Sequence, residues 1–592
     1  MKTKKIAALG IILAISLSAC TGKKADVAGD VPDNTDTEVA VSGDNADEAS
    51  GNAGDEGAAD VSSDDASGDD ASEKEDEVIV APTPILYATE YEYDHYMEKD
   101  SWFSYANISG EYPYVISEGY DALNAALKEY NTKSWGDMRY VLDNTKEIVE
   151  ESTEEDLENM KDMMPWYDEQ SVSFVRCDDI IFSYWLSDGT WMGGAHPYTY
   201  TSGVNFDSAT GKKLDLSDIT TDYDKFYELV LKKLENTQDT DYFYDEWKDT
   251  VKSMFYEDDY ALEWTITYDD INLFFNSYSL MPYAGGPVDL EISFEECGEL
   301  VNPKYMVKPS DRLMKRLPWS DNVGEYGGYA CSVDTDDDGK IDLSVSVVCD
   351  RHYDEEYEYY DCTNVTVSME KDGEETWHYL EMMDYDDAWI VEDEKGDYYL
   401  YIEELSDNDW HVLNIFDLNG KGIKYLDYNE SGAFYNMDFQ CADHIFVTTR
   451  LYTMGTYSGV TECEVGRSGQ LASKTGEYRV FTREVGVALD KDALKDSYSD
   501  SSTYESDPYL TATEDIPNMI YYTDINNREV SEKRTITKGT KLLPMYTDGE
   551  KYMIFKVKGE DAYYRVDYDN ADERTINGVP EADCLEGFIY AG

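Results

Sequence analysis

The chain has 592 residues and is strongly acidic, with 127 Asp and Glu residues against 48 Lys and Arg residues. Its formal net charge of −79 argues against nucleic acid as a partner, because phosphate binding needs the opposite sign. Basic polypeptides and divalent cations are the partners that such a field attracts. The length exceeds what one hydrophobic core usually organises, so we expect several domains.

The first twenty residues have the pattern of a secretory signal. Three lysines precede an apolar stretch of about a dozen residues, which is too short to span a bilayer comfortably. Residues 17–20, Leu-Ser-Ala-Cys, resemble the lipobox of bacterial lipoproteins. The resemblance implies that residues 1–20 are a lipoprotein signal peptide, that Cys20 carries the lipid, and that the protein is anchored to the extracytoplasmic face of the cell membrane. The alternative is an ordinary secretory peptide with a cysteine at the cleavage point.

Residues 21–83 consist mainly of Asp, Ala, Gly and Ser, with very few aromatic or branched apolar side chains. A segment with so little to bury cannot offset its ordering entropy, and its like charges repel. We therefore predict a disordered acidic tether that acts as a spacer.

Helical and alternating patterns in the next part of the chain predict an α+β fold, with helices against an antiparallel sheet. We divide this half into two domains, 84–204 and 205–300. The predicted elements are a helix within 112–131 N-capped by Ser117, a strand pair in 171–191 with a turn at 187–189, a helix over 223–236, and two strands in 269–296.

Three stretches of this half carry a resemblance to a known family. They are GEYPYVISEGYDALNAALKEYN, GGAHPYTYTSGVNFDSATGKKLDLSDI and LFFNSYSLMPYAGGPVDLEISFEE. Residues 95–300 resemble the paired domains of unknown function of lysozyme-binding anti-sigma factors in Gram-positive bacteria and of peptidoglycan deacetylases. The resemblance implies an extracytoplasmic binding module and no catalytic role for its histidine.

The sequence departs from both kinds of protein outside this module. An anti-sigma factor needs a transmembrane helix, and no run of 18 apolar residues follows the signal. A deacetylase needs paired metal-ligating histidines, and no H-x-x-x-H spacing occurs. We therefore expect neither sigma-factor control nor deacetylation.

His196 lies in the sequence GGAHPYTY, where two glycines and Pro197 favour a turn. A catalytic imidazole needs a partner within hydrogen-bond reach, and the sequence offers no obvious one. We interpret this segment as a structural or ligand-contacting loop, with metal binding and catalysis as less favoured alternatives. Candidate ligand contacts are Trp191, His196, Tyr198 and Tyr200, although these aromatic rings could instead fill the core and strand faces.

Residues 320–500 predict a mainly β domain, either a meander or a partial propeller. Its most informative stretch, DTDDDGKID, resembles the Asp-rich calcium loops of extracellular β proteins. A weak structural Ca²⁺ site is therefore predicted, since position 12 of the loop is Val345 and not a bidentate glutamate; a solvated hairpin turn is the alternative. The predicted ligands are Asp334, Asp336, Asp338, the Lys340 carbonyl and Asp342.

The C-terminal residues, 505–592, contain several short strands broken by glycines, which predicts a small SH3-like β barrel. Eight cysteines follow Cys20, and an even number outside the cytoplasm permits disulfides. Cys331 and Cys349 flank a predicted hairpin, and we predict a disulfide between them.

Taken together, these features predict a non-enzymatic, surface-anchored binding lipoprotein that recognises a cationic, lysozyme-like protein or a cell-wall glycan. The alternative is a cell-wall-active enzyme or an accessory subunit of one, although no spacing of carboxylates singles out an acid/base pair. The sequence does not indicate an oligomeric state.

Overall fold

The computed structural model describes most of the chain from residue 80 onward. Cys20, the predicted signal peptide and the tether up to residue 79 lie outside the described residues. Within the described residues, no helix is both long enough and apolar enough to cross a membrane. The described residues are 80–98, 102–237, 240–257, 262–324, 327–336, 338–354, 359–406, 410–429, 432–435, 441–481, 487–490, 493–494, 508–529 and 531–588.

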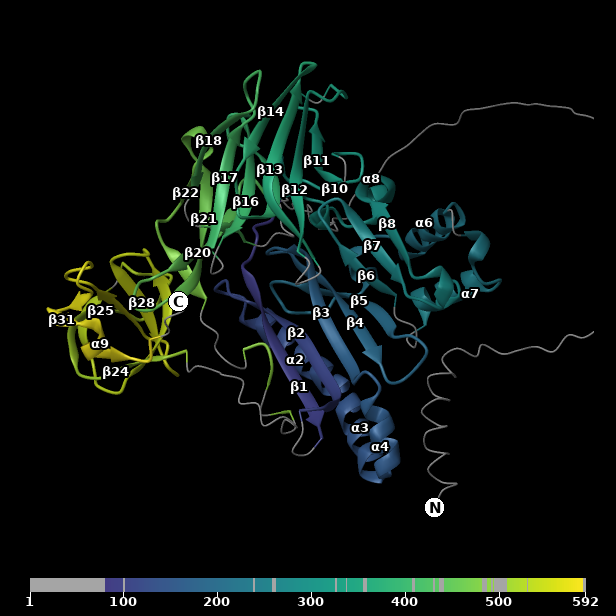
Figure 1. The fold of residues 1–592 in the computed structure, drawn as a ribbon, viewed down its shortest axis with the longest axis horizontal. Helices are drawn as coiled ribbons and strands as arrows, with labels where there is room; N and C mark the ends of the chain where they lie inside the picture. The colour runs from purple at the N-terminus through teal and green to yellow at the C-terminus, as the bar shows by residue number, and fades with distance from the viewer. Residues whose placement is uncertain are drawn as a thin grey trace, which may run out of the picture. The chain divides into compact units, whose positions relative to one another are not determined.

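The first sheet has five strands in the order β1-β2-β3-β4-β5 (Figure 1). All neighbouring strands are antiparallel except β2 and β3, which are parallel. A parallel pair needs a long crossover connection, and here three helices form it. The elements are β1 (Tyr87–Met97), β2 (Ser104–Val115), α2 (Asp121–Met138), α3 (Tyr140–Glu151), α4 (Glu154–Lys161), β3 (Trp166–Cys177), β4 (Ile181–Trp191) and β5 (Tyr198–Asp207).

Two local predictions in this sheet are wrong. Ser117 does not cap a helix: its Oγ accepts a hydrogen bond from the Leu86 N–H, and α2 starts four residues later. The turn predicted at 187–189 lies inside β4, because these residues pair with β3 on one side and β5 on the other. The turn is instead made by Asp178, whose carboxylate accepts the N–H groups of Ile180 and Ile181.

A three-stranded antiparallel sheet and its helices form the next layer, which confirms the predicted helix over 223–236 and the two strands in 269–296. On α6, Phe226, Val230 and Leu234 recur every four residues and are buried against this sheet. The domain boundary predicted between residues 204 and 205 falls inside β5. The elements are α5 (Leu216–Ile219), α6 (Tyr223–Glu235), α7 (Trp247–Tyr256), β6 (Glu263–Ile266), β7 (Asp270–Phe275), β8 (Val288–Ser293) and α8 (Phe294–Cys297).

Beyond residue 310 the fold is almost entirely β. Two five-stranded sheets follow, in the orders β10-β11-β12-β13-β14 and β18-β17-β16-β15-β9 (Figure 1). They share one apolar core that includes Val345, Val367 and Leu400. This face-to-face packing is that of a sandwich rather than a propeller. The strands are β9 (Met314–Arg316), β10 (Trp319–Ser320), β11 (Gly328–Val333), β12 (Leu343–Asp354), β13 (Tyr359–Lys371), β14 (Glu374–Leu380), β15 (Asp384–Glu392), β16 (Tyr398–Ser406), β17 (Trp410–Asp417) and β18 (Lys424–Asn429).

The predicted disulfide between Cys331 and Cys349 is wrong. Cys349 of β12 is bonded to Cys362 of β13, with their Cα atoms 5.3 Å apart, while Cys331 is a free, buried cysteine. In the β11–β12 register, Cys331 lies opposite Val345, four residues before Cys349. A register shift in the β12–β13 pair instead lies next to Cys349. The sequence showed the hairpin but not which neighbouring strand comes within bonding distance.

Among the described residues, twelve of the remaining strands belong to one sheet, in which β23 pairs with β27. The boundary predicted near residue 505 therefore separates strands of a single sheet, and the described residues contain no closed barrel. The short strands β30 and β31 pair with each other in a separate sheet. The elements are β19 (Ala433–Phe434), β20 (Ile445–Leu451), β21 (Tyr457–Val465), β22 (Leu471–Ser473), β23 (Tyr478–Phe481), β24 (Leu510–Ala512), β25 (Ile516–Tyr522), β26 (Glu532–Ile536), β27 (Lys541–Thr547), β28 (Tyr552–Val557), β29 (Tyr563–Asp567), β30 (Thr575–Ile576), β31 (Val579–Pro580), α9 (Glu581–Cys584) and β32 (Leu585–Glu586).

Candidate functional site

A cavity of about 370 Å³ lies between α2 and one face of strands β3, β4 and β5. It combines acidic, hydroxyl and aromatic side chains with one lysine. The lining residues are Tyr130, Lys133, Ser134, Asp137, Met138, Asp168, Gln170, Asp188, Thr190, Tyr198 and Tyr200.

Strand pairing explains why these side chains converge. Asp168 lies opposite Thr190, which in turn lies opposite Tyr198. Two residues further along, Gln170, Asp188 and Tyr200 form a second row. Alternate residues of a strand point to the same face of a sheet, so both rows point into one cavity.

The two aspartates of the cavity are the unusual groups electrostatically. Burial raises the pKa of Asp168 to about 6, although the carboxylate accepts a hydrogen bond from Thr190 Oγ1 at 2.9 Å. Burial also raises the pKa of Asp188, to about 7, and the charges of Asp168 and Glu263 add to the effect. Near neutral pH the cavity therefore holds carboxyl groups that a cation would stabilise in their charged form.

Glu263 of β6 reaches this wall through a close approach of two backbones. A side chain at Gly203 would collide with the Trp264 carbonyl, since an ideal Cβ would lie 1.9 Å from that oxygen. Glu263 accepts the Gly203 N–H at 2.9 Å and the Tyr200 hydroxyl at 3.2 Å. Glycine is thus required here for the second sheet to orient a wall residue of the cavity.

Of the predicted ligand contacts, Tyr198 and Tyr200 line the cavity, and Trp191 and His196 do not. Tyr198 is 42% exposed, and its ring is stacked with that of Tyr200 at a centroid separation of 6.4 Å. Trp191 follows Thr190 and so points to the other face of β4; its Nε1 donates to the Gly194 carbonyl at 3.1 Å. The tyrosines therefore form an aromatic wall beside the acidic pair.

His196 is an exposed loop residue that connects two parts of the chain. Its ring stacks on Tyr283 at 3.9 Å, and its Nδ1 lies 2.9 Å from the Pro197 carbonyl. The Tyr283 hydroxyl donates to the same carbonyl at 3.3 Å. These contacts join the Gly-Gly-x-His-Pro loop to the turn after Pro282, and they favour the structural interpretation of this histidine over the catalytic one.

Sequence reasoning missed Asp168 and Asp188. The sequence pattern predicts a turn at Asp188, and the strand that it predicts begins only at residue 171, after Asp168. The available signal was the spacing of two, Asp168 with Gln170 and Asp188 with Thr190, because polar residues on alternate positions mark one face of a strand.

The Asp-rich loop brings together three of the predicted metal ligands, Asp334, Asp336 and Asp338, whose carboxylate oxygens lie within 4.8 Å of one another. The Asp334 carboxylate accepts the N–H groups of Asp336, Asp338 and Gly339. Lys340 is paired with Asp338 through its ammonium group. Asp342 lies apart from the three and accepts the Thr335 N–H at 2.8 Å.

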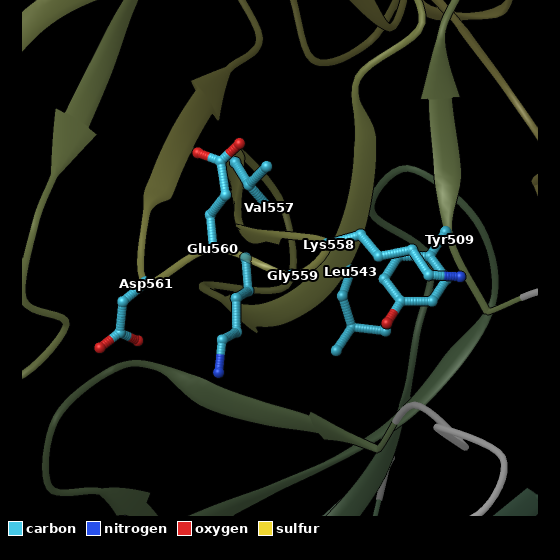
Figure 2. Close-up of a pocket in the computed structure, with 8 residues that line it drawn as sticks. Tyr509, Leu543, Val557, Lys558, Gly559, Glu560 and Asp561 are labelled. Atoms are coloured by element: carbon cyan, nitrogen blue, oxygen red, sulfur yellow. The ribbon is translucent and has the colours of Figure 1, made fainter.

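A smaller cavity of about 200 Å³ lies in the C-terminal sheet (Figure 2). Here the Lys558 ammonium lies 4.3 Å from the centre of the Tyr509 ring. Glu560 and Asp561 also line the cavity, so lysines and carboxylates share its wall.

The described residues form several β sheets, with helices packed on those of the first half and few helices in the second half. No protein-family model matches the chain, and no curated protein matches it.

Solved structures are similar to it at low identity. One is a member of the DUF3298 family from Bacteroides fragilis, with 19% identity over 37% of this chain and 95% of that chain and a TM-score of 0.29. Another is a DUF3298 protein from Pseudomonas aeruginosa, with 14% identity over 38% and 97% and a TM-score of 0.26. A third, of unknown function, comes from Dyadobacter fermentans, with 10% identity over 67% and 93% and a TM-score of 0.18.

Proposed function

We propose that this protein is a lipid-anchored binding protein of the extracytoplasmic face, and that the cavity between α2 and β3–β5 accepts a cationic group of its ligand. The observation that carries the proposal is the pair Asp168 and Asp188, whose pKa values are raised to about 6 and about 7 in a cavity with a tyrosine wall. The ligand class is a cationic, lysozyme-like protein or a cell-wall component.

The physical reason is that a bound cation can replace the proton. An ammonium or guanidinium group beside two partly buried carboxylates favours their charged form and lowers their pKa values. The rings of Tyr198 and Tyr200 can add a cation–π contact. The net charge of −79 would speed the approach of a basic partner, and this contribution should weaken with salt.

Binding of lysozyme and of peptidoglycan fragments to the full-length protein, purified in detergent, tests the proposal. We expect the double substitution Asp168→Asn and Asp188→Asn to weaken binding about tenfold or more, with most of the loss at low salt. Glu169→Gln is the matched control, because Glu169 is exposed and lies between the two rows on the opposite face of β3. Equal affinities of the double variant and the control would contradict the proposal.

A second candidate function is catalysis on the cell wall, either alone or as an accessory subunit. The favouring observation is again Asp188, since a carboxyl group with a pKa of about 7 is suited to general acid catalysis. Turnover of purified peptidoglycan that Asp188→Asn abolishes would support this function. Binding without turnover would leave the non-enzymatic role.

Three further assignments belong to the same proposal. Cys20 carries the lipid and residues 21–83 form the tether, which an intact-mass measurement of the mature N terminus would test. The Asp-rich loop binds Ca²⁺ weakly. Residues 505–592 contact the wall, an assignment by fold-level analogy with SH3-like modules. Because β27 pairs with β23, which precedes these residues, the test is whether bound wall fragments protect residues 505–592 of the intact protein from proteolysis.

A further inference from the structure

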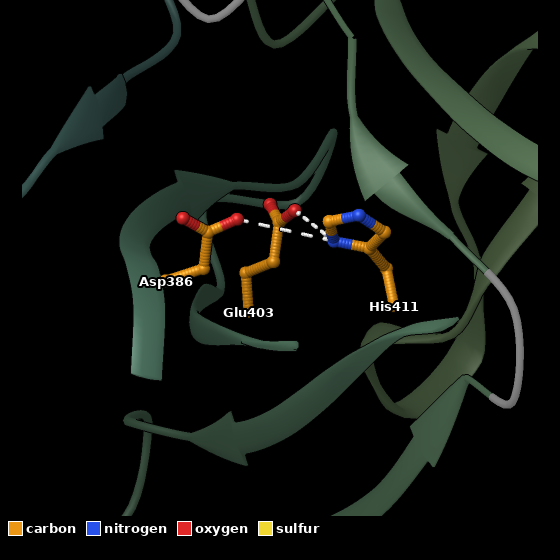
Figure 3. Close-up of side chains that lie close together, drawn as sticks. All are labelled: Asp386, Glu403 and His411. Atoms are coloured by element: carbon orange, nitrogen blue, oxygen red, sulfur yellow. Dashed lines mark ion pairs between the residues drawn. The ribbon is translucent and has the colours of Figure 1, made fainter. Parts of the chain in front are cut away.

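A second cluster of ionisable side chains lies in the β half, on the sheet formed by β15–β18. It consists of Asp386, Glu403 and His411 (Figure 3). His411 Nδ1 lies 3.0 Å from Glu403 Oε1 and 3.9 Å from Asp386 Oδ2. One ligand atom from each of the three residues lies within 4.8 Å of the other two.

The strand register places the three side chains together. His411 pairs with Leu405, two residues beyond Glu403, so His411 and Glu403 are diagonal neighbours on one face. On the other side of β16, a register shift between Tyr385 and Asp387 leaves Asp386 as an extra residue opposite Glu403. Such bulges redirect side chains and often occur next to functional sites.

Glu403 has one carboxylate oxygen that contacts His411 and one that has no hydrogen bond within the described residues. Its side chain is 1% exposed, and its Oε2 is buried and accepts no hydrogen bond from the part of the chain that the structure describes. A buried charged oxygen without a partner is destabilising.

The neighbouring carboxylates, in contrast, have partners. Arg316 Nε lies 2.7 Å from Asp387 Oδ2. Glu404 accepts the Met383 N–H at 2.9 Å and the Asn414 amide at 3.0 Å. Asp387 Oδ2 also lacks a hydrogen bond, but it lies beside the Arg316 guanidinium, and Glu404 is hydrogen-bonded through both oxygens. Among the described residues, Glu403 Oε2 accepts no hydrogen bond.

We propose that Asp386, Glu403 and His411 bind a divalent transition-metal ion, with Zn²⁺ as the ion that this ligand set suits. Two carboxylates balance the charge of the ion, and an imidazole nitrogen favours Zn²⁺ over the harder Ca²⁺ and Mg²⁺. The site is separate from the cavity of the first half, so it stands whether or not the proposed function holds.

The spacing of the ligand atoms fits such an ion. Ligand distances of about 2.1 Å in a tetrahedral site place neighbouring ligand atoms about 3.4 Å apart. The separations of 3.0 and 3.9 Å lie on either side of this value. Binding at Nδ1 requires that the imidazole proton reside on Nε2. The competing occupant is a proton on Nδ1, which would make the cluster a simple ion pair with Glu403.

Calorimetric titration of the full-length, chelator-treated protein with Zn²⁺ tests the assignment. We expect His411→Gln and Asp386→Asn each to weaken one Zn²⁺ site about tenfold to a hundredfold. These positions are 29% and 40% exposed, so the substitutions are tolerable for folding. Substitution with Co²⁺ should give a visible absorption spectrum in the wild type that His411→Gln loses.

The matched control is His444→Gln. His444 also contacts a glutamate, Glu462, at 2.7 Å, but Lys474 already pairs with that carboxylate at 2.8 Å. We expect this variant to keep the wild-type Zn²⁺ affinity. Equal Zn²⁺ binding by wild type and His411→Gln, or no binding by the wild type, would overturn the proposal and leave the proton as the occupant.

Discussion

The two ends of the β3–β4 hairpin hold charged side chains in opposite ways. At the turn end, the side chains of Arg176 and Asp178 are fully buried, with Arg176 Nε 2.7 Å from Asp178 Oδ2. The Asp178 carboxylate also accepts two backbone N–H groups, and Arg176 Nη1 donates to the carbonyls of Thr267 and Tyr305. This pair therefore links the first sheet to the segments that follow it.

At the other end of the hairpin, Asp168 and Asp188 line a cavity and have raised pKa values. Burial disfavours their charged forms, so each of these aspartates keeps its proton to a higher pH than an exposed aspartate does. A buried carboxylate of this protein stabilises the fold where the chain provides its counter-charge, as Arg176 does for Asp178. Where the chain does not provide it, the carboxylates remain available to a ligand.

The largest effect should come from breaking the structural pair. Arg176→Met leaves Asp178 buried without its counter-ion, and we expect a loss of about 3–5 kcal/mol in the free energy of unfolding. Denaturant unfolding followed by tryptophan fluorescence measures the loss. Arg565→Met is the matched control, since Arg565 and Asp567 have the same spacing but are 31% and 42% exposed, and we expect a loss of about 1 kcal/mol or less. Similar losses in the two variants would show that the buried pair stabilises the fold no more than the partly exposed pair does.

Replacing the two cavity aspartates by asparagine should change the free energy of unfolding less than Arg176→Met does. At neutral pH this change should stabilise the protein rather than destabilise it. Asp168 and Asp188 have folded-state pKa values of about 6 and about 7, well above the ordinary value of an aspartate. The folded state therefore holds these protons more tightly than the unfolded state, and the resulting stability is present below about pH 4 and is lost as pH rises through 6 and 7.

Between pH 4 and 8 we expect the free energy of unfolding of the wild type to fall by about 1–3 kcal/mol relative to that of the double variant Asp168→Asn and Asp188→Asn. Thermal unfolding of both proteins across this range measures the difference. Parallel pH profiles of the two proteins would show that ionisation of the cavity carboxylates does not destabilise the folded state.

The smallest change in stability should come from Ca²⁺ binding to the exposed aspartates of the Asp-rich loop. The carboxylates of Asp336 and Asp338 are exposed, and weak Ca²⁺ binding to their loop should add about 1–2 kcal/mol of stability in 10 mM Ca²⁺. Melting temperatures with and without Ca²⁺ measure the gain, which Asp336→Ala with Asp338→Ala should remove. Mg²⁺ serves as the control ion, and an unchanged melt in Ca²⁺ would remove the metal site from the proposal.

Local patterns in the sequence were sufficient for some elements. The helix α6 and the two strands β7 and β8 are predictable to within a few residues, because the apolar pattern of each is set by neighbours in the chain. Helices α3 and α4 were not assigned, since much of their length is exposed and polar. Ser, Asp and Gly favour a turn at 187–189, yet the strands paired on both sides of this segment keep it extended.

The candidate sites show the same limit. Tyr198 and Tyr200 were identified from the sequence, whereas Asp168 and Asp188 become their neighbours only through the β3–β4–β5 register. Asp386, Glu403 and His411 come from three strands and carry no spacing that a sequence pattern could show.

By itself, the sequence determined the acidic character of the chain, its mixture of helical and alternating segments, and the positions of the Asp-rich loop and the Gly-Gly-x-His-Pro loop. Strand register decided which cysteine Cys349 bonds, which aspartates share a cavity, and which carboxylate contacts His411. The physical reason is that propensity and charge are properties of neighbouring residues. Burial and counter-charge, in contrast, depend on segments that are distant in the chain and that only the packed sheets bring together.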